Sequence, residues 1–463
     1  MGEANKLMES TVPYIIYLIS AFIVSVYLSR RTDRKVLTFA LVFWIFSEPY
    51  LDAMFIISFP GLPFEFQPNR ILLIFLFFYL LLGHLFSFQK YSITSATPPF
   101  EKYMYFYILV VTLSLMYNYS DIRQQLMGAV PAAIFTFIII YQTGKRYITV
   151  SSFDAIIKAI IILSVVCSFI ALLQIFYDAD FLRAGRTRLA FSDIYRATGI
   201  FAEEYEFGVI QILAYIIIYS KYGVSHLSKL LIPLLVISIL MTFHRLDIMI
   251  LILCTSIYFW FFQRSYNKFI FPLSILFIAF LSLTFLYMFE SELLESAFVQ
   301  GRLLEEHESI RARQWDAIFT ELKEYAFLGL GGYGNPTYSE IMGRYDLLQS
   351  MKLPNSEWIE RGYIPHSGYL EVLVLYGVLA FIIFISFFYS ILRYFYRTID
   401  RYNPGTSVPF FTALIWATSN TTNGMISFSA YSTLLYALIF GIYIGKHSID
   451  VKQQNRELTV GSI

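Results

Sequence analysis

A single connection between two apolar segments, residues 181–208, concentrates charged side chains that could bind an anion. It carries arginines closely followed by glutamates: Arg183, Arg186, Arg188, Arg196, Glu203, Glu204 and Glu206. A planar guanidinium group binds phosphate through two parallel, charge-assisted hydrogen bonds. The alternative is that these arginines pair with the glutamates or extend to lipid headgroups. The pattern therefore favours a phosphate site, with a purely structural role as the alternative.

Two further groups of arginines offer the same chemistry. Arg245 and Asp247 lie in a short polar stretch between two apolar runs, where Arg245 either binds an anion or forms a buried ion pair. Arg311 and Arg313 flank the start of a helical pattern, where a solvated basic face is the alternative.

One histidine is a candidate for proton transfer. His366 stands where a long polar segment returns to an apolar one, in the run YIPHSGYL at 363–370. Imidazole can take a proton from a hydroxyl near neutral pH, which is the chemistry of a general base. A capping or packing histidine is the alternative.

Several other kinds of site are excluded by the sequence. It has no Walker loop, no His/Cys cluster with metal-ligand spacing and no Gly-x-Ser-x-Gly nucleophile elbow. The run GLGGYG at 329–334 follows a helical pattern rather than a strand, so it does not predict a dinucleotide site. We therefore expect neither a metal nor a cofactor, and the activated bond of any reaction must arrive with the substrate.

The composition indicates that membrane helices position these residues. Of the 463 residues, 57% are hydrophobic and 14% are charged, with a mean hydropathy of +0.61. Soluble domains carry about 25% charged residues, so this chain lacks the polar surface to cover itself in water. The net charge of +1 argues against nucleic-acid binding, which depends on clustered Lys and Arg.

Apolar runs of membrane length recur along the chain. A helix of roughly 20 apolar residues spans the hydrocarbon core, and a helix satisfies its own backbone there. The sequence therefore predicts an all-α, polytopic integral membrane protein with about 12–14 transmembrane helices. The expected segments lie near 12–29, 36–59, 70–88, 103–117, 124–142, 155–177, 199–219, 230–243, 246–262, 269–289, 368–392, 408–428 and 429–445.

The basic residues of short loops predict the orientation of these helices. If the loop that contains Arg30, Arg31, Arg34 and Lys35 is cytoplasmic, Lys and Arg are concentrated on that side and the N-terminus lies outside. The arginines described above then face the outside. We expect an N-terminal bundle at 1–289, a large periplasmic loop domain at 290–367, and C-terminal helices with a cytoplasmic tail at 368–463.

The long polar segment is expected to fold, because a structureless loop of this length is unusual. Residues 309–325 predict an amphipathic helix whose apolar side chains are near helical spacing: Ile310, Trp315, Ile318, Phe319 and Leu322. The glycine-rich run at 329–336 predicts its end. The loop domain is thus expected to be helical.

In this order, the motifs over residues 190–380 resemble those of the bacterial O-antigen polymerase and O-antigen ligase superfamily of membrane glycosyltransferases. The pieces are an Arg-x-x-Gly helix entry at 196–199, Arg245 at the outer end of a span, Arg-x-x-x-Trp at 311–315, the glycine-rich turn at 329–334, and His366-Ser-Gly-Tyr-Leu followed by Gly377. Many relatives carry Asn where this chain has Ser367, and Ser-Arg where it has His244-Arg245. His244 is therefore a second candidate for proton transfer.

The resemblance implies metal-free transfer of a glycan from an undecaprenyl-diphosphate carrier to a sugar hydroxyl at the periplasmic face. Carried over by position, Arg196 and Arg245 would bind the diphosphate and His366 would orient or deprotonate the acceptor hydroxyl. Guanidinium groups suit this task because a diphosphate leaving group develops negative charge. The further residues expected to bind substrate are Arg188, Arg311, Arg313, Glu204 and Tyr369.

We interpret the sequence as a polymerase of lipid-linked repeat units in the bacterial inner membrane. The resemblance also implies a chain-length regulator protein as a partner, beside the lipid-linked oligosaccharide and the bilayer. An O-antigen ligase, which transfers finished polymer to lipid A core or to protein, is the first alternative. A transporter or lipid-linked-sugar flippase is the second, because many spans with buried charges would serve it equally.

Overall fold

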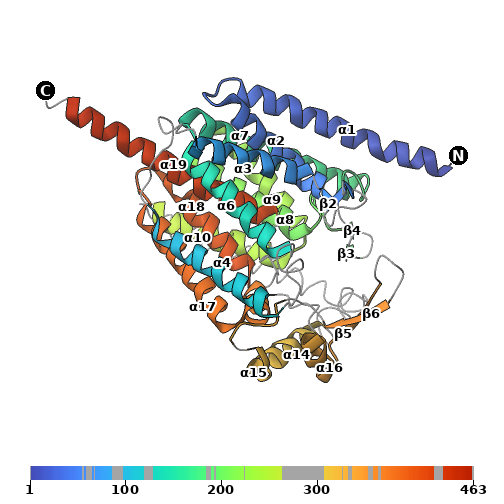
Figure 1. Cartoon of the computed structure of the whole chain (residues 1–463). Helices are drawn as coiled ribbons and strands as arrows, with labels where there is room; N and C mark the ends of the chain where they lie inside the picture. Colours follow the sequence, from blue (N-terminus) through green and yellow to red (C-terminus); the bar gives the residue numbers. More distant parts are fainter. Residues whose placement is uncertain are drawn as a thin grey trace.

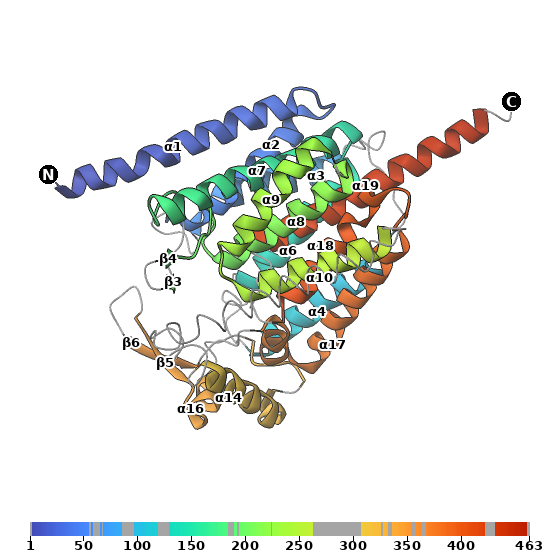
Figure 2. The same cartoon turned by 180° about the vertical axis from the view of Figure 1, so that it is seen from behind.

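The computed structural model describes most of the chain as a bundle of helices (Figures 1 and 2). The described residues are 2–54, 57–58, 65–66, 68–85, 97–118, 129–183, 189–191, 194–223, 225–262, 307–325, 327–331, 336–352, 358–362, 367–421 and 431–460. The expected all-α polytopic architecture is confirmed. Within these residues, three short antiparallel hairpins, which the sequence pattern did not predict, accompany the helices.

The bounds of the elements are as follows. The helices are α1 (Gly2–Ser29), α2 (Lys35–Met54), α3 (Pro68–Leu85), α4 (Pro99–Asn118), α6 (Ala129–Tyr147), α7 (Val150–Phe176), α8 (Glu204–Tyr222), α9 (His226–Leu240), α10 (Arg245–Phe262), α14 (His307–Thr320), α15 (Leu322–Tyr325), α16 (Pro336–Arg344), α17 (Gly368–Arg397), η2 (Pro404–Ser407), α18 (Val408–Ser419) and α19 (Tyr431–Val460). The hairpins pair β1 (Ile57–Ser58) with β2 (Glu65–Phe66), β3 (Leu189–Phe191) with β4 (Ile194–Tyr195), and β5 (Leu348–Lys352) with β6 (Trp358–Gly362).

Each expected apolar segment overlaps a helix, apart from 269–289, which lies outside the described residues. The segment 36–59 extends past the end of α2 into β1, and the segment 199–219 begins before α8. Within the described residues, five helices are long and apolar enough to cross a membrane: α1, α7, α10, α17 and α19. The chain is therefore a multi-pass membrane protein. The total of about 12–14 spans stays a prediction.

Helix α8 lies at the centre of the bundle. Its residues from Phe207 to Ile218 are buried on every side, which is typical of a helix that is apolar all round. Helices α7, α9, α10, α18 and α19 pack against it. The first turn of α8 is therefore held rigidly at one end of the bundle and its last turn at the other.

Helix α17 is broken at Gly377, whose φ of 81° is outside the helical region. The break leaves the carbonyl groups of Val374 and Leu375 free to accept hydrogen bonds from outside the helix. Leu330 N donates to Val374 O at 2.9 Å, and Gly331 N donates to Leu375 O at 2.8 Å. Irregular backbone at membrane depth is tolerated where protein buries it in this way. The segment at 327–331 is thus fastened to the broken helix.

A second apolar core lies between α14, α16 and the start of α17 (Figure 1). The β5–β6 hairpin contacts α16. The largest buried side chain of this core is Tyr338, and Ile318 packs in the same core. The expected helix at 309–325 is confirmed, but it is interrupted between α14 and α15. Its expected apolar face is wrong in part, because Ala317 and Ile318 pack inward while Trp315 and Phe319 are about half exposed.

Candidate anion-binding site

The turn that carries Arg196 is clamped by one buried amide. Gln174 of α7 accepts hydrogen bonds from the backbone nitrogens of Thr198 and Gly199, each at 3.0 Å. Its Nε2 donates to Gly199 O at 2.7 Å and to Phe181 O at 2.9 Å. Gly199 has a φ of 58°, a left-handed conformation that glycine adopts without strain. The Arg-x-x-Gly motif is therefore a fixed turn between α7 and α8.

Arg196 is paired with a carboxylate, and its buried Nε has no hydrogen-bond partner among the described residues. Its Nη1 lies 2.7 Å from Glu204 Oε1 in the first turn of α8. Arg183 Nη2 donates to Arg196 O at 2.7 Å, while its Nε donates to Ala179 O. Burial lowers the pKa of the Arg183 guanidinium, although nearby carboxylates oppose the shift. Within the part of the chain that the structure describes, Arg196 Nε and Arg183 Nη1 are buried without a hydrogen-bond partner, so both guanidinium groups keep donor capacity.

His244 and Asp247 form a second polar group at the start of α10. His244 Nδ1 lies 3.0 Å from Asp247 Oδ1, but the pair lacks the alignment of a hydrogen bond. The His244 backbone nitrogen donates to Thr242 Oγ1 at 3.1 Å. Asp247 is fully buried, and it lies so close to Gly208 that a Cβ at that position would collide with its carboxylate. The absence of a side chain at Gly208 thus makes room for Asp247.

The two groups adjoin each other. Ala197 N donates to Met241 O at 3.0 Å, which joins the turn of Arg196 to the segment that leads into α10. Glu204 also interacts electrostatically with Asp247. We call these residues together the arginine–histidine cluster: Arg183, Arg196, Glu204, His244 and Asp247.

Other residues expected to bind substrate lie around this cluster or apart from it. Arg245 follows His244 directly and is exposed. Arg313 is exposed on α14, and no ion pair joins it to the cluster within the described part of the chain. Tyr369 is half-buried in the first turn of α17, where its hydroxyl donates to Ala417 O at 2.8 Å.

Three of the residues expected to bind substrate or transfer a proton lie wholly or partly outside the described residues. Arg188 and His366 lie outside the described residues, and the side chain of Arg311 does so too. Their roles, like those of the residues above, stay predictions.

Sequence reasoning missed two residues that shape the cluster. Gln174 was not singled out, although it is the one side-chain amide in the largely apolar helix α7. Gly208 was also missed, because its role depends on the close approach of α10 to α8. The first could have been noticed from composition, whereas the second could not.

The arrangement suits an anionic ligand. It combines arginine donors with a histidine that lies 3.0 Å from a buried carboxylate. No group of three or more His, Cys, Asp or Glu side chains that could hold a metal ion is found among the residues that were described.

The architecture is that of a multi-pass membrane protein with a charged site at one end of the bundle. Residues 230–385 match the family model described as O-antigen ligase. The match confirms the resemblance to the O-antigen polymerase and ligase superfamily, and it suggests a glycosyltransferase-like enzyme of O-antigen processing. It runs from α9 into α17, so it includes His244, Arg245 and Asp247 but begins after Arg196. No curated protein matches the chain.

Proposed function

We propose that the protein is a polymerase that joins oligosaccharide repeat units carried on undecaprenyl diphosphate. The reaction would take place at the periplasmic face of the bacterial inner membrane. The acceptor sugar hydroxyl attacks the anomeric carbon of the donor, a new glycosidic bond forms, and the bond to the diphosphate breaks. The proton of the hydroxyl passes to a histidine, and the lipid diphosphate leaves as an anion.

The proposal is supported chiefly by the buried donor capacity of the arginine–histidine cluster. Arg196 is oriented by Glu204, yet no described residue provides a hydrogen-bond partner for its Nε. A diphosphate oxygen at this nitrogen would complete its hydrogen bonding, and a preorganised donor of this kind stabilises developing charge. Arg245 would hold the second phosphate, with Arg188, Arg311 and Arg313 assisting.

The proton-accepting role is proposed for His366, with His244 as the second candidate. In this scheme Tyr369, three residues after His366, would border the acceptor sugar. Asp247, 3.0 Å from His244 Nδ1, would stabilise a protonated imidazole if His244 is the residue used.

A ligase is the second candidate function, because the family model that matches residues 230–385 is described as O-antigen ligase. It would use the same lipid-linked donor and the same arginine chemistry. The acceptor would be lipid A core or a protein instead of a second lipid-linked glycan.

The test uses purified full-length protein in lipid with its undecaprenyl-diphosphate-linked repeat unit, and it resolves the products by size. Wild type should yield a ladder of longer lipid-linked glycans without added metal. Arg196→Ala, Arg245→Ala and His366→Ala should abolish the ladder while the proteins remain folded. Arg393→Ala, an exposed arginine near the end of α17, is the matched control and should leave it intact.

The outcomes separate the candidate functions. If no ladder forms but added lipid A core or protein restores transfer, the protein is a ligase. If no acceptor supports a new glycosidic bond, both transferase functions are wrong and transport is the function to test.

A further inference from the structure

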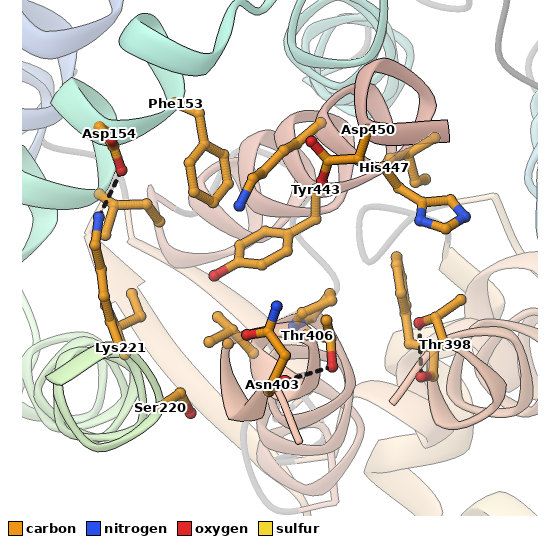
Figure 3. A pocket seen from close by; sticks show the side chains of 18 of the residues that line it. Phe153, Asp154, Ser220, Lys221, Thr398, Asn403, Thr406, Tyr443, His447 and Asp450 are labelled. Atoms are coloured by element: carbon orange, nitrogen blue, oxygen red, sulfur yellow. Dashed lines mark hydrogen bonds and ion pairs between the residues drawn. The ribbon is translucent and has the colours of Figure 1, made fainter. Parts of the chain in front are cut away.

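Figure 3 shows a cavity of about 220 Å³ between the helices. This cavity lies at the end of the bundle opposite the arginine–histidine cluster. Helix α8 links the two places, because Glu204 is in its first turn and Lys221 lines the cavity near its last residue. At 1.5 Å per residue these positions are roughly 25 Å apart, which is close to the thickness of the hydrocarbon core. The cavity therefore lies near the other membrane surface.

The cavity is walled by five parts of the chain: the start of α7, the end of α8, the end of α17, the η2–α18 junction and the middle of α19. Figure 3 shows Lys221 and Asp154 joined on one side, with His447 and Thr398 on the other. Asn403 and Thr406 approach from below, across from the Tyr443 ring. Polar groups from separate elements thus converge on one space, as is typical of a ligand site.

One lysine in this cavity makes no ion pair within the described residues, although Asp450 also lines the cavity. Lys221 Nζ lies 2.6 Å from Asp154 Oδ1, so its charge is already paired. Lys446 Nζ instead lies over the Phe153 ring, 4.8 Å from its centroid. No ion pair includes Lys446 within the described residues. An ammonium group in this setting would gain most from an anion that enters the cavity.

We propose that this cavity binds a phosphate group at Lys446. An ammonium group is a common point-charge partner of phosphate, and basic pockets between membrane helices bind the head groups of anionic lipids. The volume of about 220 Å³ is below the usual range for drug-sized ligands, so it suits a phosphate with a short polar attachment. The phosphate would be carried by a membrane phospholipid or be free in solution. This site is independent of the proposed glycan transfer.

The experiment compares the full-length wild type with Lys446→Gln in detergent. Native mass spectrometry with added phosphatidylglycerol, and with diacylglycerol as the phosphate-free control, tests a lipid source. Thermal unfolding in inorganic phosphate, against chloride at equal ionic strength, tests a soluble source. Lys229→Gln is the matched control, because Lys229 is an exposed lysine near the same end of the bundle.

We expect Lys446→Gln to weaken phosphate-dependent binding about tenfold, as for loss of one charge-assisted hydrogen bond. Lys446→Arg should retain it, and Lys229→Gln should not change it. If Lys446→Gln binds phosphatidylglycerol more weakly than wild type does, the phosphate belongs to a lipid. If Lys446→Gln loses only the stabilisation by inorganic phosphate, the ligand is a soluble ion. Equal binding by wild type and Lys446→Gln in both assays overturns the proposal.

A second variant covers the case in which Lys446→Gln does not fold. Asn403 lines the cavity but makes no side-chain capping bond to η2, so Asn403→Leu should be tolerated. It should also weaken the same phosphate-dependent signal. Unchanged binding in a folded Asn403→Leu protein would count against the site.

Discussion

Gly329 and Gly377 pack backbone against backbone, so that a Cβ atom on Gly377 would lie 2.7 Å from the Gly329 nitrogen. Both have positive φ, 67° and 81°. Helix α4 reinforces the contact, because Ser114 Oγ donates to Leu328 O and Asn118 Nδ2 donates to Gly329 O at 3.0 Å. Two separate glycine motifs of the sequence thus form one joint between the polar segment and α17.

Substitution at this joint should release the segment at 327–331 from α17. Gly377→Ala would place a Cβ against the Phe327 carbonyl and would hold a non-glycine residue at φ 81°. We expect the backbone strain to lower the free energy of unfolding by about 1–3 kcal/mol, and the collision to lower it further. Thermal unfolding and limited proteolysis near residue 330 measure it. Gly343→Ala, where a new Cβ meets only ordinary contacts, is the control and should have little effect.

Loss of the Gln174 clamp should loosen the turn of Arg196. Gln174→Leu keeps a side chain of similar size but leaves the amides of Thr198 and Gly199 without their acceptor. Each buried, unpaired group costs about 1–3 kcal/mol, so the melting temperature should fall by several degrees. Leu173→Ala, at an exposed neighbouring position, should change it far less. Equal melting temperatures for wild type and Gln174→Leu would show that the clamp is unimportant.

The position of the Asp247 carboxylate should depend on the absence of a side chain at Gly208. Gly208→Ala places a methyl group against the Asp247 carboxylate, so either α10 or the carboxylate must move. Overpacking of this kind costs about 1–3 kcal/mol. The double variant Gly208→Ala/Asp247→Ala should recover part of that loss, because the smaller side chain makes room. Strictly additive changes in unfolding free energy would argue against direct contact.

Much of the fold could be predicted because the length and the apolar composition of membrane helices can be recognised in a sequence. The apolar run near 155–177 became α7, and that near 368–392 became α17. The break at Gly377 was not predicted, since it depends on hydrogen bonds from residues 330 and 331, far away in the sequence. The β5–β6 hairpin was also missed, because its strands lie in a segment with no strong alternation.

The candidate site could be predicted in its charges but not in its geometry. Arg196, Glu204 and Asp247 stood out because charged groups beside apolar helices are rare. That Glu204 would pair with Arg196 was one of two alternatives, and only the placement of α8 joins them at 2.7 Å. The role of Gly208 could not be read from sequence, because it arises from contact between two helices.

The most direct test of the central claim measures whether the arginines bind the lipid diphosphate. Arg245 is the best probe, because its side chain is exposed and no ion pair of the described residues includes it. Undecaprenyl diphosphate is titrated against folded wild type, Arg245→Gln and the control Arg393→Gln, with native mass spectrometry as the readout. We expect Arg245→Gln to bind at least about tenfold more weakly, as for loss of a charge-assisted contact, and Arg393→Gln to bind as wild type does. Equal affinity in all three proteins would contradict the claim that Arg245 binds the diphosphate.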